Sequence, residues 1–183
     1  DIKNNSQITR LKSLGIKIFE SQSPKNIEFI CKNLSKSPEI VFSSAILNDN
    51  QELQTARNLN LKISHRSEIL ARLITSHKSI VVAGTHGKTT TSTIIATLLS
   101  KAQKDPTALI GGLVPCFNSN AKVGESSLLI AEADESDGTL TKFFPKIGIL
   151  TNLELDHTNH YKTLQELIDT MRKYGSNCET LIA

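Results

Sequence analysis

Apolar and polar positions along the chain follow two different periods. Apolar residues three or four positions apart predict amphipathic helices, whereas short continuous or alternating apolar runs predict strands. The predicted helices are 8–14, 26–34, 52–59, 66–74, 89–101 and the segment that follows Thr163. The predicted strands are 16–19, 39–43, 62–64, 80–83, 107–110, 127–131, 147–150 and 180–182. Strands that alternate with helices in this way predict an α/β fold with parallel sheets.

Some of these helices have recognisable ends and buried faces. Gly15 follows the first helix and is expected to end it. Thr163 and Glu166 have the spacing of a capping box, which predicts a helix start at that point. The apolar face expected for this last helix consists of Leu164, Leu167, Ile168, Met171 and Tyr174. The side chains that the helix 89–101 is expected to bury are Ile94, Ile95, Leu98 and Leu99.

The elements form two groups on either side of the polar stretch 76–78. We therefore expect two domains, residues 1–76 and residues 77–183. The first is expected to be an incomplete Rossmann-like domain that lacks its first strand. The second is expected to contain a parallel sheet and to end within it.

The segment 79–93 joins a buried strand to a helix through a glycine-bracketed turn. Its apolar start is typical of a strand that is buried on both faces. Gly84 and Gly87 let backbone N–H groups face inward, and the following helix N-terminus adds partial positive charge. Lys88 supplies a point charge for phosphates, and the Thr89 hydroxyl can bind a phosphate-bound Mg²⁺. This turn therefore predicts a nucleotide-phosphate site, and we expect the second domain to be part of a P-loop-type ATP-binding domain.

The turn is a shorter variant of the common motif G-x-x-x-x-G-K-[ST], because Val82 stands where that motif has its first glycine. The alternative is a plain strand-to-helix turn with an exposed lysine. Threonine is a poor helix former, yet it recurs in the opening turns of this helix. This favours a functional role for the threonine hydroxyl groups over the plain turn. The positions are Thr89, Thr90, Thr91, Thr93 and Thr97.

Acidic residues follow the next buried strand. Glu132 comes directly after the apolar run 128–131, so its position is fixed at the carboxyl end of that strand. A carboxylate there can reach the Mg²⁺ beside the γ-phosphate if the two strands are parallel. The other members of the acidic run are expected to be solvated and are Asp134, Glu135 and Asp137.

A third strand, 147–150, is followed by the polar run Thr151-Asn-Leu-Glu-Leu-Asp-His157. This loop is a candidate for a second-metal and water-organising group. On this pattern alone, His157 is either a metal ligand or a surface residue. His86 lies inside the phosphate turn, where its backbone matters more than its ring. The histidines without partners at ligand spacing are His65, His77 and His160.

Composition excludes several other classes. The 183 residues are 38% hydrophobic, with no apolar run of membrane-spanning length and no secretion signal, so we expect a soluble cytoplasmic protein. The net charge of +3 comes from scattered lysines with little aromatic interleaving, which argues against nucleic-acid binding. Three widely spaced cysteines indicate neither a disulfide framework nor a cysteine zinc site.

Taken together, the motifs resemble those of the Mur ligases, ATP-dependent enzymes of peptidoglycan synthesis, and in particular the alanine-adding members. The motifs are Gly84-Thr-His-Gly-Lys-Thr-Thr90, Glu132-Ala-Asp-Glu-Ser-Asp137 and the run that ends at His157. Shorter matches in order and spacing are Ser43-Ser-Ala-Ile46, Arg66-Ser-Glu68 and Gly111-Gly-Leu113. The resemblance covers nearly the whole chain. It implies that the first domain also lacks the glycine-rich turn with which family members start.

The resemblance implies a ligase in which the carboxylate of UDP-N-acetylmuramate attacks the γ-phosphate of ATP and L-alanine then displaces phosphate. It implies that Lys88 binds the β- and γ-phosphates, that Thr89 and Glu132 hold one Mg²⁺, and that His157 holds a second. The ATP-binding positions that it implies are Gly84, Thr85, His86, Gly87, Lys88, Thr89 and Thr90. The sugar-nucleotide positions that it implies are Asp1, Ser43, Ser44 and Gly112. Because the family's amino-acid-binding domain is absent from this sequence, we expect no turnover by these residues alone.

Two other functions fit parts of the pattern. A murein-peptide recycling ligase shares the phosphate turn and joins a tripeptide to the same sugar nucleotide. A non-catalytic nucleotide-binding module would keep the turn but would have no use for Glu132 and His157 as metal ligands.

Overall fold

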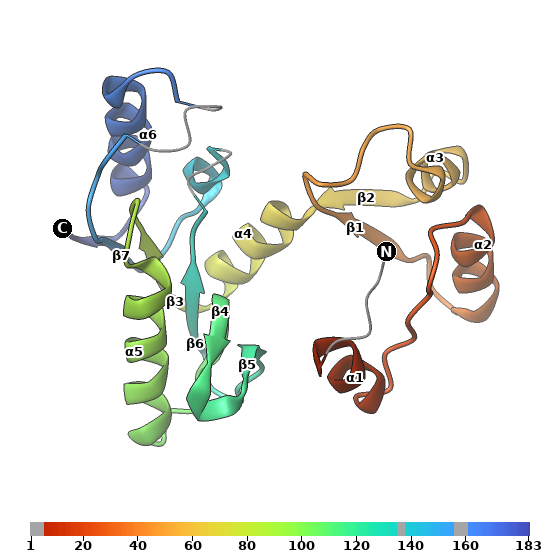
Figure 1. Ribbon diagram of the computed structural model, residues 1–183, viewed down its shortest axis with the longest axis horizontal. Coiled ribbons are helices and arrows are strands. Elements are labelled where there is room, and N and C mark those ends of the chain that lie inside the picture. Colours follow the sequence, from red (N-terminus) through yellow and green to blue (C-terminus); the bar gives the residue numbers. More distant parts are fainter. Residues whose placement is uncertain (1–5, 135–137, 156–160) are drawn as a thin grey trace. The chain divides into compact units, whose positions relative to one another are not determined.

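The computed structural model describes residues 6–134, 138–155 and 161–183 (Figure 1). Packing divides the chain into two units, one ending at Ile69 and the other beginning at Leu70. The division falls inside the helix α4 (Arg66–Ser76), the end of which packs in the core of the second unit. The domain boundary predicted between residues 76 and 77 would follow the last residue of α4 and stays a prediction.

The first unit contains a short parallel sheet and its helices. The elements are α1 (Ser6–Ser13), α2 (Pro24–Asn33), β1 (Glu39–Phe42), α3 (Gln51–Asn58), β2 (Lys62–His65) and the start of α4. β1 and β2 pair in parallel, with Ile40 opposite Ile63. α2 and α3 lie side by side, and Ile27, Leu53 and Ala56 on these helices are buried (Figure 1).

Local signals in the sequence set several helix ends. Gly15 follows α1 with φ of +78°, the left-handed conformation that glycine adopts without strain. Asn50 caps α3, because its Oδ1 accepts from the N–H groups of Glu52 and Leu53 at 3.0 and 3.1 Å.

The strand predicted at residues 16–19 is wrong, since this segment pairs with no strand among the residues that the structure describes. Its side chains instead pack against α2. The rings of Phe19 and Phe29 meet edge to face with their centroids 6.1 Å apart, and the Lys17 Nζ lies 3.4 Å from the centre of the Phe29 ring. These contacts are made by Lys17 and Phe19, whereas Ile16 is 46% exposed, so the alternating residues do not form the buried face of a strand.

Among the described residues, the second unit forms a six-stranded sheet in the order β5-β4-β6-β3-β7-β8. Its strands are β3 (Lys78–Ala83), β4 (Thr107–Val114), β5 (Ser119–Lys122), β6 (Leu128–Glu132), β7 (Ile147–Leu150) and β8 (Thr180–Ile182). Its helices are α5 (Lys88–Lys101), α6 (Leu164–Ser176) and the short 3-10 helices η1 (Pro115–Phe117) and η2 (Thr139–Lys142). Every neighbouring pair of strands is parallel except β4 and β5. The predicted α/β fold with a parallel sheet is confirmed.

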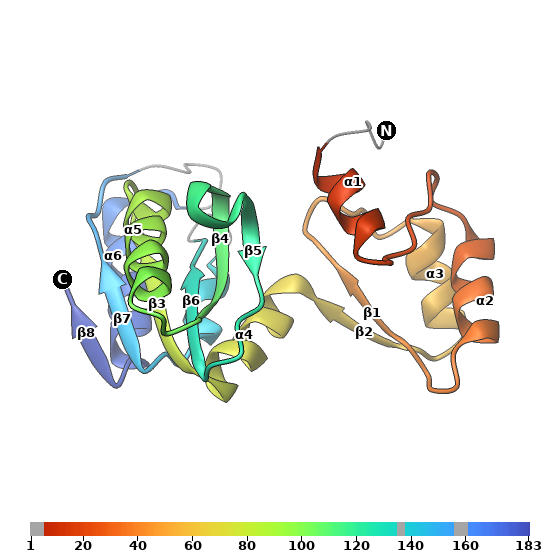
Figure 2. The same cartoon turned by 90° about the horizontal axis from the view of Figure 1, so that it is seen from below.

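Helices cover both faces of this sheet, as Figure 2 shows for α5 and α6. On the α5 face, Ala96 packs with Ala108, Ile110 and Val114. The end of α4 and the apolar face of α6 cover the other side. The buried residues there include Ile74, Val81, Ala83, Leu129, Ala131, Leu167, Met171 and Tyr174.

Tyr174 ties α6 to the middle of the sheet. Its hydroxyl donates to the carbonyl oxygen of Val81 on β3 at 2.8 Å, and the residue is fully buried. Burial raises the pKa of the Tyr174 phenol far above its ordinary value, and the neighbouring Cys178 adds to the shift. Burial also raises the pKa of the Cys178 thiol. Leu164, predicted on the same face of α6, is instead 45% exposed.

The helix predicted at 89–101 is confirmed as α5, but the prediction of its buried face is wrong. Ile94 and Leu98 are 53% and 61% exposed, and Ile95 and Leu99 are only half-buried. The fully buried side chains of α5 are the small ones, Ser92 and Ala96. Small side chains let a helix approach a sheet closely, so size decides which face turns inward.

The region after residue 110 also differs from the prediction. β4 does not end before the glycines but continues through Gly111 and Gly112 to Val114. β5 then pairs with it in antiparallel orientation, and the sequence pattern did not predict this strand. Ala121 is the one apolar residue of β5, because an edge strand outside the core needs no apolar run.

Candidate nucleotide-binding site

Three strands of the second unit end beside the phosphate loop, which we define as residues 84–88. β3 leads into this loop, and β6 and β7 flank β3 in the sheet. Glu132 is the last residue of β6, and the segment 151–155 follows β7. Since the three strands are parallel, their carboxyl ends lie at one edge of the sheet, where open α/β sheets bind ligands.

Two glycines shape the phosphate loop. Gly84 has φ of +127°, and a Cβ at this position would overlap the hydroxyl of Thr151. Gly87 has φ of +79° and is the N-cap of α5. Side chains other than glycine rarely adopt either conformation. α5 begins at Lys88, the last residue of the loop. The N–H groups of its first turn have no partner within the helix.

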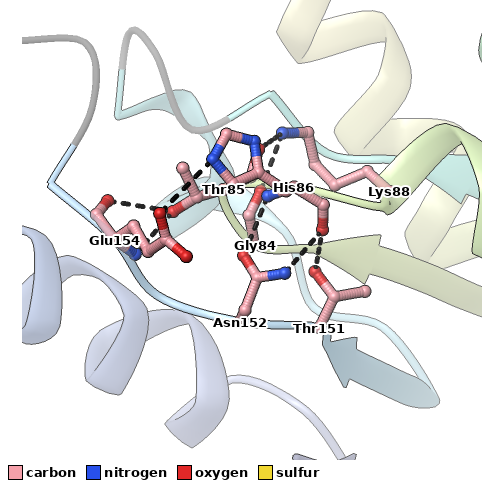
Figure 3. A network of polar contacts seen from close by, with 7 residues as sticks. All are labelled: Gly84, Thr85, His86, Lys88, Thr151, Asn152 and Glu154. Atoms are coloured by element: carbon pink, nitrogen blue, oxygen red, sulfur yellow. Dashed lines mark hydrogen bonds and ion pairs between the residues drawn. The ribbon is translucent and has the colours of Figure 1, made fainter.

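Lys88 lies across its own loop. Its Nζ donates to the carbonyl oxygens of Gly84 at 2.7 Å and Thr85 at 3.0 Å (Figure 3). The ammonium group and the start of α5 are thus close together, and both favour a bound anion.

The carboxylate of Glu132 is held beside the start of α5. The Thr89 hydroxyl lies 2.9 and 3.0 Å from its two oxygens and donates to the carboxylate. The N–H of Gly111 on β4 donates to Oε2 at 2.8 Å. These contacts join three elements, β4, β6 and α5, at one carboxylate.

The glycine pair of β4 leaves room for this arrangement. A Cβ at Gly111 would lie 3.1 Å from Oε2 of Glu132, and a Cβ at Gly112 would lie 2.8 Å from Cγ2 of Thr89. The prediction singled out Gly112 and missed Gly111. Gly111 contacts Glu132 through its backbone N–H, which nearly every residue type has, so the sequence does not indicate this contact.

The segment after β7 braces the phosphate loop from the other side (Figure 3). The Asn152 side chain makes two hydrogen bonds with the backbone of His86: Oδ1 accepts from the N–H at 2.9 Å, and Nδ2 donates to the carbonyl at 3.0 Å. The Thr151 hydroxyl donates to the same carbonyl at 2.6 Å. The structure therefore turns Asn152, predicted within a metal-organising group, toward the loop.

A second bracing contact runs in the opposite direction, from a side chain of the loop to the backbone after β7. The Thr85 hydroxyl donates to the carbonyl oxygen of Glu154 and accepts from its N–H, both at 3.0 Å. Thr85 is only 6% exposed, and its buried hydroxyl satisfies both backbone groups of Glu154. The His86 ring lies 3.6 Å from the Glu154 carboxylate, although both side chains are exposed.

The structure brings together several of the predicted site residues. Residues 84–90, Glu132 and Gly112 lie around the start of α5. The roles of residues 84–90 and Glu132 toward ATP and Mg²⁺, and that of Gly112 toward the sugar nucleotide, stay predictions. His157 and Asp1 lie outside the described residues, as do Glu135 and Asp137.

The remaining predicted residues, Ser43 and Ser44, lie in the first unit, next to the carboxyl end of β1. Ser43 lines a cavity of about 390 Å³, together with Ile27, Phe42 and Arg66 among others. Ser44 Oγ lies 3.1 Å from Nε2 of His65.

His65 contacts two serines. The N–H of Ser67 donates to Nδ1 at 3.3 Å, and the Ser67 hydroxyl oxygen lies 2.8 Å from the same nitrogen. The other ring nitrogen, Nε2, contacts Ser44, so the imidazole links the two serines. The sequence reasoning that set His65 aside missed this pairing.

The donors at Glu132 suit Mg²⁺. A carboxylate and a hydroxyl are hard oxygen ligands, and Mg²⁺ binds through one or two carboxylates together with phosphate oxygens and water. Within the described ranges, no group of three or more His, Cys, Asp and Glu side chains could hold a metal. A Mg²⁺ that is shared with nucleotide phosphates requires no such group.

Comparison with known proteins identifies the family. Residues 82–182 match the Mur ligase middle domain, and residues 1–78 match a second model described as the Mur ligase family, catalytic domain. The chain therefore belongs to the Mur ligase family.

Individual relatives agree with this assignment. The UDP-N-acetylmuramate–L-alanine ligase of one Prochlorococcus marinus strain is 55% identical over the whole chain, which covers 39% of that protein. The enzyme of the same name from Synechococcus sp. (strain RCC307) is 50% identical, with 38% of it covered. The chain thus spans about two fifths of the length of these relatives.

Solved structures show the same fold. The UDP-N-acetylmuramate-alanine ligase of Thermotoga maritima has a TM-score of 0.81 at 27% identity, over 99% of this chain and 41% of that one. A UDP-N-acetylmuramate:L-alanyl-γ-D-glutamyl-meso-diaminopimelate ligase from Neisseria meningitides has a TM-score of 0.83 at 24% identity, over 97% and 59% of the two chains. The second likeness, at its lower identity, bears on the fold alone.

Proposed function

We propose that this chain is the ATP-binding and sugar-nucleotide-binding part of a ligase that joins L-alanine to the carboxylate of UDP-N-acetylmuramate, in the cytoplasm. The relatives at 50–55% identity carry the name of that activity. The observation that supports the proposal best is the Glu132 carboxylate, held by Thr89 and Gly111 at the start of α5. A carboxylate fixed beside a phosphate loop is what phosphoryl transfer with Mg²⁺ requires.

In this proposal, the residues of the second unit bind ATP and balance its charge. Lys88 and the first turn of α5 bind the β- and γ-phosphates. Thr89 and Glu132 would hold Mg²⁺, which neutralises the charge of the phosphates when it is bound. Phosphoryl transfer depends on alignment and charge stabilisation, so fixed donors matter more here than a covalent nucleophile.

The first unit would bind the sugar nucleotide. Its cavity is lined by six apolar and five polar residues, and Ser43 and Arg66 are among the polar ones. Apolar walls with polar groups that fix orientation are typical of small-molecule sites. The cavity also lies where β1 ends, the edge of a parallel sheet at which ligands bind. Ser44, which contacts His65, supplies a hydroxyl at the same edge.

The test is phosphate release by the full-length protein with ATP, Mg²⁺ and UDP-N-acetylmuramate. We expect release that depends on L-alanine and stops when a chelator removes Mg²⁺. Release that depends on the tripeptide L-alanyl-γ-D-glutamyl-meso-diaminopimelate, and not on alanine, would assign the protein to the recycling reaction instead. Nucleotide binding without any turnover would leave only the binding-module function.

A further inference from the structure

We propose that Asn152 and Thr151 are positioning residues for the phosphate loop and that the affinity for ATP depends on them. We call these two residues the loop clamp. The inference rests on the proposed ATP site at the same loop. It assigns the clamp a role that acts through His86, without contact between the clamp and the nucleotide.

The geometry of Asn152 carries the first step. A side-chain amide has one donor end and one acceptor end, like a peptide group, and Asn152 uses both on the backbone of His86, at 2.9 and 3.0 Å. Two hydrogen bonds to the N–H and C=O of one residue fix both peptide planes around it. Asn152 is itself exposed, so these bonds affect the local shape of the loop more than the overall packing.

Thr151 connects the clamp to the sheet. Its hydroxyl donates to the His86 carbonyl at 2.6 Å, and its own N–H donates to the carbonyl of Ala83 at 3.0 Å. It follows Leu150 of β7, which lies opposite Ala83 of β3. Gly84 makes room for the Thr151 hydroxyl, because a Cβ there would overlap it. The end of β7 thereby sets the position of the loop.

The clamp also selects which amides remain for a phosphate. Because the N–H of His86 donates to Asn152, it is directed toward the protein. The phosphates are then left to the loop glycines and to the first turn of α5. Without the clamp, the His86 peptide can rotate and the loop loses the shape in which these donors converge on one anion.

The experiment compares Asn152→Ala with Asn120→Ala in the full-length protein. Asn120 provides a matched control, since it is an exposed asparagine on the edge strand β5. Calorimetric titration gives the Kd of each protein for Mg²⁺·ATP and for UDP-N-acetylmuramate. We expect Asn152→Ala to raise the Kd for Mg²⁺·ATP about tenfold, the effect of losing two hydrogen bonds. The Kd for the sugar nucleotide and both Kd values of Asn120→Ala should stay within about twofold of the unsubstituted protein.

A pair of Thr151 variants gives a second measurement. Thr151→Val keeps the shape but loses the hydroxyl, whereas Thr151→Ser keeps the hydroxyl. We expect Thr151→Val to weaken Mg²⁺·ATP binding more than Thr151→Ser does.

Two results would contradict the proposed role of the loop clamp. One is an unchanged Kd for Mg²⁺·ATP in Asn152→Ala, and the other is an equal loss of sugar-nucleotide affinity, which would indicate general damage. If the unsubstituted protein binds no ATP, the proposed function fails and the clamp fails with it. If Asn152→Ala binds ATP as tightly as the unsubstituted protein, the proposed role of the loop clamp is rejected and the proposed function is retained.

Discussion

The two units differ in how they hold the residues at the carboxyl ends of their parallel strands. In the first unit, His65 contacts Ser44 and Ser67 beside a cavity lined by six apolar and five polar residues. In the second unit, side chains from neighbouring segments fix one another. Glu132 is held by Thr89 and Gly111, and the backbone of His86 is held from the end of β7.

This difference matches the two tasks that we propose. A cavity with apolar and polar walls can bind and orient a ligand without any movement of charge. A site at which charge moves between phosphate oxygens needs donors and cations that are already in place, since reorganisation during the reaction would raise the barrier. The denser polar network therefore belongs to the unit in which we place the chemistry.

The largest effect that we expect comes from removing the cation of the phosphate loop. Lys88→Ala in the full-length protein should lower kcat/KM for ATP about 100- to 1000-fold, because one preorganised charge is lost where negative charge is greatest. The Kd for UDP-N-acetylmuramate should not change, since its proposed site is in the first unit. Lys101→Ala, at the exposed end of α5, is the matched control. Unchanged turnover in Lys88→Ala would contradict the comparison between the two units.

A smaller effect is expected from crowding Thr89. In Gly112→Ala, the new Cβ would lie 2.8 Å from Cγ2 of Thr89, so the threonine must shift and its hydrogen bond to Glu132 is disturbed. A hydrogen bond to a charged group is worth about 1.5–3 kcal/mol, so we expect the Kd for Mg²⁺·ATP to rise about 30-fold. Serine has no Cγ2, so the double variant Gly112→Ala with Thr89→Ser should recover part of the affinity. A double variant as weak as Gly112→Ala would show that Thr89 does not transmit the effect.

Much of the second unit could be predicted from the sequence because its signals are local. The run before Gly84, the two loop glycines and the threonines of α5 define a strand, a turn and a helix without long-range information. The same holds for Glu132, because a carboxylate directly after a parallel strand must lie at the edge where the strands end.

Other features could not be predicted because they depend on pairing in space. The contact of Gly111 with Glu132 is made by a backbone N–H, and an asparagine after a strand gives no indication that its amide will bind His86. On α5, a hydrophobicity rule places Ile94 and Leu98 inside, whereas close packing against the sheet selects Ser92 and Ala96. The larger, more hydrophobic side chains are therefore a poor guide when a helix lies close to strands.

A substitution in the first unit should have the opposite pattern to Lys88→Ala, with weaker sugar-nucleotide binding and unchanged ATP binding. Ser43→Trp would fill much of the cavity of about 390 Å³, and we expect the Kd for UDP-N-acetylmuramate to rise about tenfold in the full-length protein. The Kd for Mg²⁺·ATP should stay the same. Leu47→Trp places the same side chain at a nearby residue that is 71% exposed, and it serves as the control. Loss of ATP affinity in Ser43→Trp, with the sugar nucleotide still bound tightly, would refute the assignment of this cavity.

The smallest effect on ligands should come from Tyr174, which stabilises the second unit from the face opposite α5. Tyr174→Phe leaves the Val81 carbonyl without its 2.8 Å donor, which should lower the free energy of unfolding by about 1–3 kcal/mol with no change in either Kd.

The size of this loss in unfolding free energy should depend on pH, because burial raises the pKa of the Tyr174 phenol above its ordinary value of 10.0. Above that pH, the unfolded chain releases the phenol proton while the folded protein keeps it, so the unsubstituted protein loses stability by up to about 1.4 kcal/mol per pH unit. The variant has no such group, so the difference between the two proteins, measured by calorimetric unfolding, should be largest near neutral pH and shrink as the pH rises past about 10. A difference that stays constant into the alkaline range would mean that the Tyr174 hydroxyl is accessible to water in the folded protein and does not hold α6 to β3.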